Sequence, residues 1–381
     1  MNDQPGLPDP IWVDTPRKFA VAIAEFKDQP ALAVDTESNS LYVYREQVCL
    51  IQISTPAKDF LIDPLSLTDL SPLGPIFANS NQEKIFHASE YDFICLKRDF
   101  QFTFSALFDT MVAARILGVA QFGLAPLLEL KLGVIVDKRY QRANWGVRPL
   151  SPSMLDYARL DSHYLFELRT ILEAELKERG LLSLAREDFE LACSVKNVSN
   201  GEKNPGCWKV AGRQPLGPQQ AAVLQELCRY RDDQAQKMDL PLFKVLSNEL
   251  LVSICLQPPV TVEDLSQVHG MNERMIRRHG AGLLETVQRG LALPPLRREP
   301  RIRPDEKFVK RVERLKDWRK EKAKELKVES DVILPREILE QIAARNPQNS
   351  QELMDIMQAV PWRYKHFGRS IQAHLKNQEI P

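Results

Sequence analysis

The chain has 381 residues, of which 44% are hydrophobic and 27% charged, so it can bury substantial cores and is long enough for two or three domains. Its 51 Lys and Arg balance its 51 Asp and Glu, which gives the whole chain no preference for a polyanionic partner. No apolar run approaches the roughly 20 residues that span a bilayer, and the N-terminus lacks the basic start and apolar core of a secretory signal. The six cysteines are scattered without a Cys-x-x-Cys pair, which argues against a thiolate zinc site and indicates a reducing compartment, the cytoplasm.

The first half of the chain alternates strand-like and helix-like segments. In chain order we predict a helix over 17–27, strands over 31–37, 42–54, 59–63 and 84–88, a helix over 91–98, a strand over 106–109, and helices over 110–117 and 124–132. Ser151-Pro152-Ser153 is a typical helix start, and an apolar period near 3.6 then predicts one long helix to about Gly180. Strands first and interleaved helices later indicate an α/β domain built around a mixed sheet.

The second half of the chain follows a stretch rich in Asn, Gly, Pro and Lys, over 197–218, and is helical in pattern. Shifted by 88 residues, this half matches itself: Leu227–Arg231 falls on Leu315–Arg319, Pro259 on Pro347, and Gly280 on Gly368. Because one offset holds without a gap, we infer two copies of one helical domain.

These boundaries divide the chain into five parts. We predict a first domain over 1–195, a linker over 196–215, a helical domain over 216–293, a linker over 294–304 and a second helical domain over 305–381. Leu296–Lys327 carries 14 Lys and Arg against seven Asp and Glu. The interleaved charges fit a solvated helix with i,i+4 pairs, and the surplus of cations equally fits a footprint for an RNA backbone.

Two carboxylates stand at the end of the strand predicted over 31–37. Asp35 and Glu37 are two residues apart, so they project from the same face of a strand. Like charges at this separation repel, and burial strengthens the repulsion, so a positive partner is expected between them. Hard divalent cations prefer carboxylate oxygens, and the pair therefore predicts a metal site, against the plainer interpretation of a solvated strand end.

Three further residues match this pair. Asp92 opens a helix just after a short apolar strand, and Tyr157 and Asp161 lie one turn apart on the long predicted helix, so they share a face. Alone, each has an ordinary interpretation: a helix N-terminal acid, a half-buried packing tyrosine and a surface acid. Together they supply acids and a phenol at the ends or faces of elements that can converge on one cleft.

The order of these residues resembles the DEDDy 3′-5′ exonucleases, and in particular the ribonuclease D family: Asp-x-Glu on the first strand, a helix-opening Asp about 55 residues on, then Tyr-x-x-x-Asp. Four further segments are similar to those that this family keeps around its motifs: Val48–Ile53, Phe60–Pro64, Leu107–Thr110 and Trp145–Leu150. The repeated helical domain resembles the HRDC domain, which is also found in RecQ-type helicases and of which ribonuclease D carries two. Many DEDD exonucleases place Asn four residues before the second-motif Asp, whereas this chain has Ala88 there and a polar His87 beside it.

The resemblance implies a ribonuclease-H-like mixed sheet for the first domain and two all-α HRDC-like bundles behind it. It further implies two Mg²⁺ or Mn²⁺ ions, with Asp35 bridging both, Glu37 and Asp161 on the nucleophile side, and Asp92 holding the other ion. Tyr157 would orient the attacking water, since a free phenol with a pKa near ~10 is a poor base at neutral pH.

Other residues are weaker candidates for substrate contact. Gln52 lies in an apolar strand and fits either a contact to the terminal nucleotide or a core amide bonded to backbone. His87 fits a phosphate donor or a satisfied histidine beside a strand, and Arg148 fits a phosphate contact or a solvated loop.

These features together predict an enzyme that releases nucleoside 5′-monophosphates from RNA with a single-stranded 3′ end. The family implication is processing of tRNA precursors and small structured RNAs, without a membrane and without an obligate protein partner. Two alternatives remain open: a nucleic-acid-binding scaffold that keeps an inactive nuclease-like domain, and a DNA-directed exonuclease of the same fold, as in Werner-type proteins.

Overall fold

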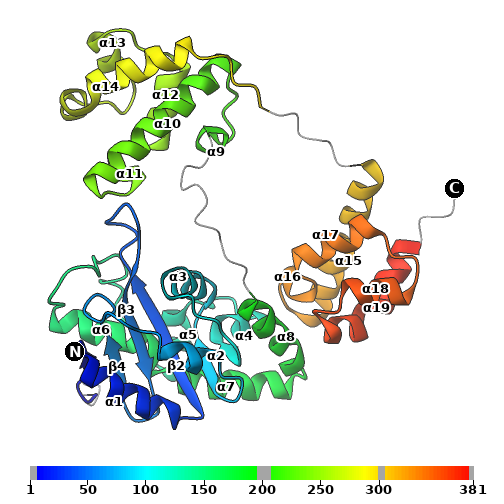
Figure 1. Ribbon diagram of the computed structural model, residues 1–381. Coiled ribbons are helices and arrows are strands. Elements are labelled where there is room, and N and C mark those ends of the chain that lie inside the picture. The colour runs from blue at the N-terminus through cyan, green and yellow to red at the C-terminus, as the bar shows by residue number, and fades with distance from the viewer. Residues whose placement is uncertain (1–6, 195–206, 299–304, 377–381) are drawn as a thin grey trace. The chain divides into compact units, whose positions relative to one another are not determined.

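A computed structural model describes residues 7–194, 207–298 and 305–376 (Figure 1). The chain forms two compact units. Unit 1 holds the first domain together with the second helical domain, and unit 2 holds the first helical domain together with residues 39–47. Most of the predicted first linker, up to residue 206, and residues 299–304 of the second linker and of the basic segment lie outside the described residues.

The first domain is built on a six-stranded mixed sheet in the order β1-β4-β3-β2-β5-β6. Its strands are β1 (Ile11–Val13), β2 (Ala31–Ser38), β3 (Val48–Ser54), β4 (Asp59–Ile62), β5 (Glu83–Phe86) and β6 (Leu107–Asp109). The meander β2-β3-β4 is antiparallel, whereas β1, β5 and β6 each pair in parallel with a neighbour. The predicted mixed sheet is therefore confirmed, with β2 near its centre.

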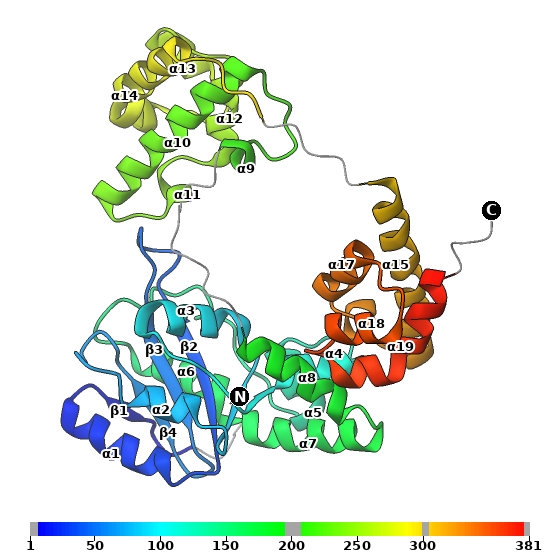
Figure 2. The same ribbon diagram turned by 45° about the vertical axis from the view of Figure 1, so that its right-hand side comes forward.

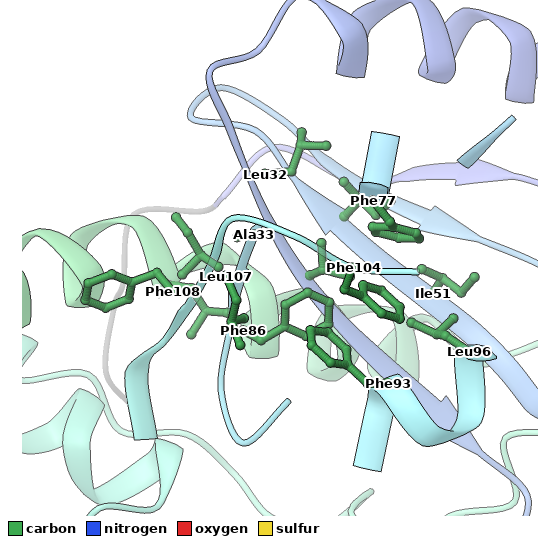
Figure 3. Packing of buried hydrophobic residues seen from close by; sticks show 14 of the residues in the cluster. Leu32, Ala33, Ile51, Phe77, Phe86, Phe93, Leu96, Phe104, Leu107 and Phe108 are labelled. Atoms are coloured by element: carbon green, nitrogen blue, oxygen red, sulfur yellow. The ribbon is translucent and has the colours of Figure 1, made fainter. Parts of the chain in front are cut away.

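Helices cover both faces of this sheet. They are α1 (Pro16–Lys27), α2 (Leu73–Ala78), α3 (Glu90–Phe100), α4 (Thr110–Ile116), α5 (Leu124–Leu132), α6 (Pro152–His163), α7 (Leu165–Glu178) and α8 (Leu182–Cys193). Figure 3 shows Phe93 and Leu96 of α3 packed beside Ile51 of β3. The preceding residue, Leu50, faces the other way and packs in a separate cluster with residues of α6. The sheet is thus enclosed between α3 on one face and α6 on the other.

Two predicted elements have the wrong bounds and three elements were not foreseen. The strand predicted over 42–54 begins only at Val48, as β3. The long helix expected from Ser151 to about Gly180 is two helices, α6 and α7, which meet at Tyr164. The last residue of α6 contacts a strand that is distant in sequence: His163 Nδ1 lies 2.9 Å from the Asp59 carboxylate of β4. The short strand β1 and the helices α2 and α8 were absent from the predicted elements.

The two helical domains repeat each other as predicted. The first contains α10 (Pro218–Met238), α11 (Leu242–Val245), α12 (Asn248–Leu256), α13 (Val262–Gln267) and α14 (Glu273–Ala292), and the second contains α15 (Glu306–Leu326), α16 (Ser330–Ile333), α17 (Arg336–Arg345), α18 (Ser350–Ile356) and α19 (Pro361–Lys376). Each helix of the second copy begins 88 residues after its counterpart. Even a buried contact is repeated, because Arg231 donates to the carbonyl of Leu246 at 3.1 Å and Arg319 to that of Leu334 at 2.9 Å.

The first helical domain begins earlier than predicted. Residues Cys207–Ala211, which fall in the predicted linker, form α9, and Val210 and Ala211 belong to the core of this domain. Among the described residues, no helix combines the length and the apolarity needed to cross a membrane.

The second helical domain packs directly on the first domain within unit 1 (Figure 2). Arg363 of α19 is fully buried and pairs with Glu187 and Asp188 of α8 at 3.1 and 2.8 Å. Its guanidinium also donates to the carbonyl of Val332. A charge removed from water needs such partners, so Arg363 fixes α19 on α8.

Candidate active site

The acids predicted from the sequence converge at the end of β2. Asp35 and Glu37 project from one face of β2, and α6 packs across that face and brings Asp161 to them. One carboxylate oxygen from each of Asp35, Glu37 and Asp161 lies within 4.8 Å of the other two. The i,i+2 spacing on the strand and the position on the helix therefore produce the cluster that they predict.

Asp92 joins this cluster from the opposite face of the sheet. It sits in the first turn of α3 and is buried, with 7% of its surface exposed. Thr36, whose side chain points away from those of its neighbours Asp35 and Glu37, donates its hydroxyl to the Asp92 carboxylate. Thr36 was not among the predicted site residues, although strand alternation places it on the face where α3 lies.

The electrostatics show four carboxylates that repel one another. Burial, followed by the charges of Asp92, Asp161 and Glu37, raises the pKa of Asp35 well above its usual range. The pKa of Asp161 rises to about 7 through burial and Asp92. Burial also raises the pKa of Asp92 to about 7, against the opposing hydrogen bond from Thr36. Such shifts mark acids that lack cationic partners within the described protein.

A buried aspartate, Asp109, orients the turn that precedes Asp92. Its carboxylate accepts from the backbone N–H groups of Ala88 at 3.1 Å and Ser89 at 2.7 Å, and it also caps α4 through Met111 and Val112. Ala88 has a φ of 63°, in the left-handed region that a non-glycine residue rarely adopts. Asp109 thus stabilises a strained turn whose geometry directs Asp92 into the cluster.

Tyr157 lies on α6 beside the acids. Its ring lies 6.0 Å from that of Trp145 and 5.8 Å from that of Tyr140. Burial and then the charges of Asp161, Glu37 and Asp35 raise the pKa of Tyr157 above its ordinary value. In the metal-free site the phenol therefore stays protonated at neutral pH and can donate a hydrogen bond.

Arg148 is committed to the protein rather than open to a phosphate, which corrects the substrate-binding role predicted for it. Its Nε and Nη2 pair with Asp63 at 2.9 and 2.6 Å, and it also donates to the carbonyls of Cys49, Trp145 and Val147. All five N–H donors of the guanidinium are used, so a phosphate contact would require breaking one of these bonds. Arg148 holds the loop after Trp145 onto the sheet.

Replacing Arg148 with methionine should lower the free energy of unfolding by about 2–4 kcal/mol, because the buried Asp63 carboxylate loses its partner. Urea denaturation of both proteins measures this loss. The slope of RNA affinity against salt concentration should stay unchanged, since no phosphate contact is removed. A shallower slope with unchanged stability would restore the phosphate role.

The other two weak candidates are also enclosed. Gln52 is fully buried, so its amide does not reach a bound nucleotide. The predicted contact to the terminal nucleotide is therefore wrong. His87 Nδ1 lies 2.9 Å from the Thr110 hydroxyl, and burial lowers the pKa of His87 to about 4. A neutral imidazole offers no positive charge to a phosphate, so the geometry favours the interpretation of a satisfied histidine beside the strand.

The raised pKa of Asp92 predicts a pH-dependent cost for the metal-free protein. Because the folded value of about 7 exceeds the ordinary 3.8, the folded state holds a proton that the unfolded state releases, and this stabilisation disappears as the pH rises through 7. Replacing Asp92 with asparagine removes the cost. The advantage in free energy of unfolding of this variant over wild type should grow by roughly 1–3 kcal/mol from pH 5 to pH 8. Urea denaturation in EDTA at both pH values measures the gain, and a constant difference would contradict it.

This donor set fits a hard divalent cation. Carboxylate oxygens within a few ångströms are the ligands that Mg²⁺ and Mn²⁺ take, and a cation between them would relieve the repulsion. Asp35, Glu37, Asp92 and Asp161 would hold such ions. The ions would supply activation of a water and stabilisation of a leaving oxygen.

Comparison with known proteins agrees with this geometry. A family model described as 3′-5′ exonuclease matches residues 10–177, and the HRDC domain model matches residues 220–287 and 309–375. Ribonuclease D of Pseudomonas paraeruginosa is 28% identical over 380 residues, covering 97% of this chain and 98% of its own. The crystal structure of Escherichia coli RNase D superposes with a TM-score of 0.70 at 25% identity, covering 97% of this chain and all of the other. The chain therefore has a 3′-5′ exonuclease domain followed by two HRDC domains, and it is similar to ribonuclease D proteins along nearly its whole length.

The chain is also similar to longer proteins. The exosome complex exonuclease RRP6 of Saccharomyces cerevisiae is 33% identical over 297 residues, which cover 74% of this chain. The chain spans only 40% of that protein. The match to ribonuclease D, by contrast, extends through the nuclease and both HRDC domains.

Proposed function

We propose that this protein is a 3′-5′ exoribonuclease that removes nucleoside 5′-monophosphates one at a time from RNA, using two Mg²⁺ or Mn²⁺ ions. The observation that carries the proposal is the convergence of Asp35, Glu37 and Asp161 within 4.8 Å, with Asp92 close enough to raise the pKa of both Asp35 and Asp161. A retired site would have no need to keep four mutually repelling acids, which cost stability when nothing neutralises them.

The residues of the chain have separate tasks in this reaction. The charges of Asp92, Asp161 and Glu37 all act on Asp35, so Asp35 would help to hold both ions, together with Glu37 and Asp161 for one ion and Asp92 for the other. Thr36 and Asp109 fix Asp92 before substrate arrives, so that no reorganisation is needed at the moment of reaction.

Tyr157 serves as an orienting donor rather than as a base. A free phenol has a pKa near ~10 and is a poor base at neutral pH, and the Tyr157 ring lies beside the rings of Trp145 and Tyr140. A fixed hydroxyl can align the attacking water with the terminal phosphate, and such alignment lowers the barrier through orientation alone.

The proposed substrate is RNA with a single-stranded 3′ end, including tRNA precursors and small structured RNAs. The solved E. coli relative is described as an exoribonuclease involved in structured RNA processing. The two HRDC domains would add contacts to the RNA backbone through the exposed cations of α15, whereas Arg311 and Arg319 of this helix donate to backbone carbonyls within the domain. The cytoplasm remains the proposed compartment, in keeping with the scattered cysteines of the sequence, which contains no Cys-x-x-Cys pair.

The direct test is incubation of the purified full chain with 5′-labelled RNA that ends in a single-stranded 3′ tail, with Mn²⁺ or with EDTA. A ladder that shortens by single nucleotides with Mn²⁺, releases nucleoside 5′-monophosphates and is abolished by EDTA supports the proposal. RNA binding without hydrolysis under every metal condition would favour the scaffold alternative instead.

A matched DNA tail of the same sequence addresses the remaining alternative. RNA and DNA differ at the 2′-hydroxyl, which is the group that lets a protein distinguish them at a given site. Faster turnover of the RNA tail supports an exoribonuclease, whereas faster turnover of the DNA tail would overturn that part of the proposal.

A further inference from the structure

A fully buried amide in the middle of β3 lacks any partner among the described residues. The side chain of Gln52 is 0% exposed, and neither its Nε2 nor its Oε1 has a hydrogen-bond partner. The structure therefore differs from the plainer expectation of a core amide bonded to backbone. An unpaired buried amide costs free energy, so its presence in a native fold calls for a partner that arrives later or a function that requires it.

The register of the sheet places Gln52 beside the acid cluster. In the antiparallel pair of β2 and β3, Gln52 stands directly opposite Asp35. Residues opposed in this way point to the same face, with Cβ atoms roughly 4.5–5.5 Å apart. Leu50, on the same face of β3, packs with α6, the helix that supplies Asp161. Gln52 thus lies between the sheet and α6, beside Asp35 and shielded from solvent.

We propose that Gln52 is a positioning residue whose Nε2 donates a hydrogen bond to the Asp35 carboxylate when the divalent ions are bound. This inference rests on the proposed function, because it requires ions at the cluster. Groups that hydrogen-bond a metal ligand from behind orient it and tune its affinity for the metal. An amide suits this task, since it donates to a carboxylate without adding a further negative charge to a site that already holds four acids.

Replacing Gln52 with methionine separates this role from a purely structural one. Methionine keeps a similar length but removes both polar atoms, so the metal-free fold should lose nothing and its melting temperature in EDTA should stay level or rise. Mn²⁺ binding, measured by titration calorimetry without RNA, should weaken about tenfold or more. The kcat for RNA should fall while KM changes little, because a buried amide does not touch the substrate.

Gln82 provides the matched control. It is also a buried glutamine, at 3% exposure, but its Nε2 donates to the carbonyls of Phe26 and Gln29 at 2.6 and 2.7 Å, away from the acids. Gln82→Met should lower the melting temperature in EDTA and leave the Mn²⁺ affinity unchanged. Gln52→Leu serves as a second apolar variant in case the methionine packs poorly.

Two results would overturn the role of Gln52. One is Mn²⁺ affinity equal to that of wild type in either Gln52 variant. The other is a loss of melting temperature in both variants as large as that of Gln82→Met, which would show that the amide has a structural partner. Absence of Mn²⁺ binding by the wild-type protein would instead overturn the two-ion site itself, so the two failures are distinguishable.

Discussion

Replacing Asp35 with asparagine is expected to lower the rate of RNA hydrolysis by about a thousandfold or more. Asp35 is the residue on which the charges of Asp92, Asp161 and Glu37 all act, so it is the natural ligand for more than one cation. An amide cannot provide the same charge, and loss of several kcal/mol of transition-state stabilisation corresponds to at least this factor. Single-turnover hydrolysis of a 3′-tailed RNA at saturating Mn²⁺ measures the effect.

Two further measurements make the result specific. Asp35→Asn should bind RNA in EDTA as wild type does, and the melting temperature should no longer rise with added Mn²⁺. Asp156→Asn is the matched control, because Asp156 is an exposed acid on α6 that pairs with Arg159. A variant at Asp35 that retains hydrolysis within tenfold of wild type would refute the proposed mechanism.

Local periodicity was sufficient to predict which of the candidate residues share a face. Asp35 and Glu37 share a strand face and Tyr157 and Asp161 share a helix face, and these relations depend only on backbone geometry over a few residues. The offset of 88 residues likewise predicted two equivalent helical domains, because it compares the chain with itself. The sequence predicts the structure well for residues that are a few positions apart and for domains that are related by a constant offset.

The roles that sequence reasoning missed all depend on distant partners. Arg148 is satisfied by Asp63, and the turn at Ala88 by Asp109. Nothing near either residue in the sequence indicates these bonds. The break at Tyr164 is similar, since no Gly or Pro marks it and the apolar period continues from α6 into α7. Gln52 is a further example, because the sequence of an apolar strand does not indicate whether a buried amide has a hydrogen-bond partner.

Replacing Arg363 with methionine is expected to lower the free energy of unfolding of unit 1 by about 3–5 kcal/mol, because Glu187 and Asp188 are left without their shared cation. The substitution has an internal precedent. At the offset of 88 residues the first helical domain carries Met275, which packs against the core of that domain. Methionine is therefore compatible with this helix fold, and the loss reports on the contact with α8 rather than on the folding of α19.

Urea denaturation of the full chain measures the loss, with Arg369→Met as the control because Arg369 is exposed on the same helix. Adding Glu187→Gln and Asp188→Asn to Arg363→Met should recover part of the stability, since the penalty arises mainly from unpaired buried acids. If Arg363→Met costs less than about 1 kcal/mol, which is typical of an exposed ion pair, the buried pairing does not hold the second helical domain on the nuclease. The first helical domain has Met275 at the position equivalent to Arg363. The contact with α8 therefore depends on a residue specific to the second helical domain and not on the fold that the two domains share.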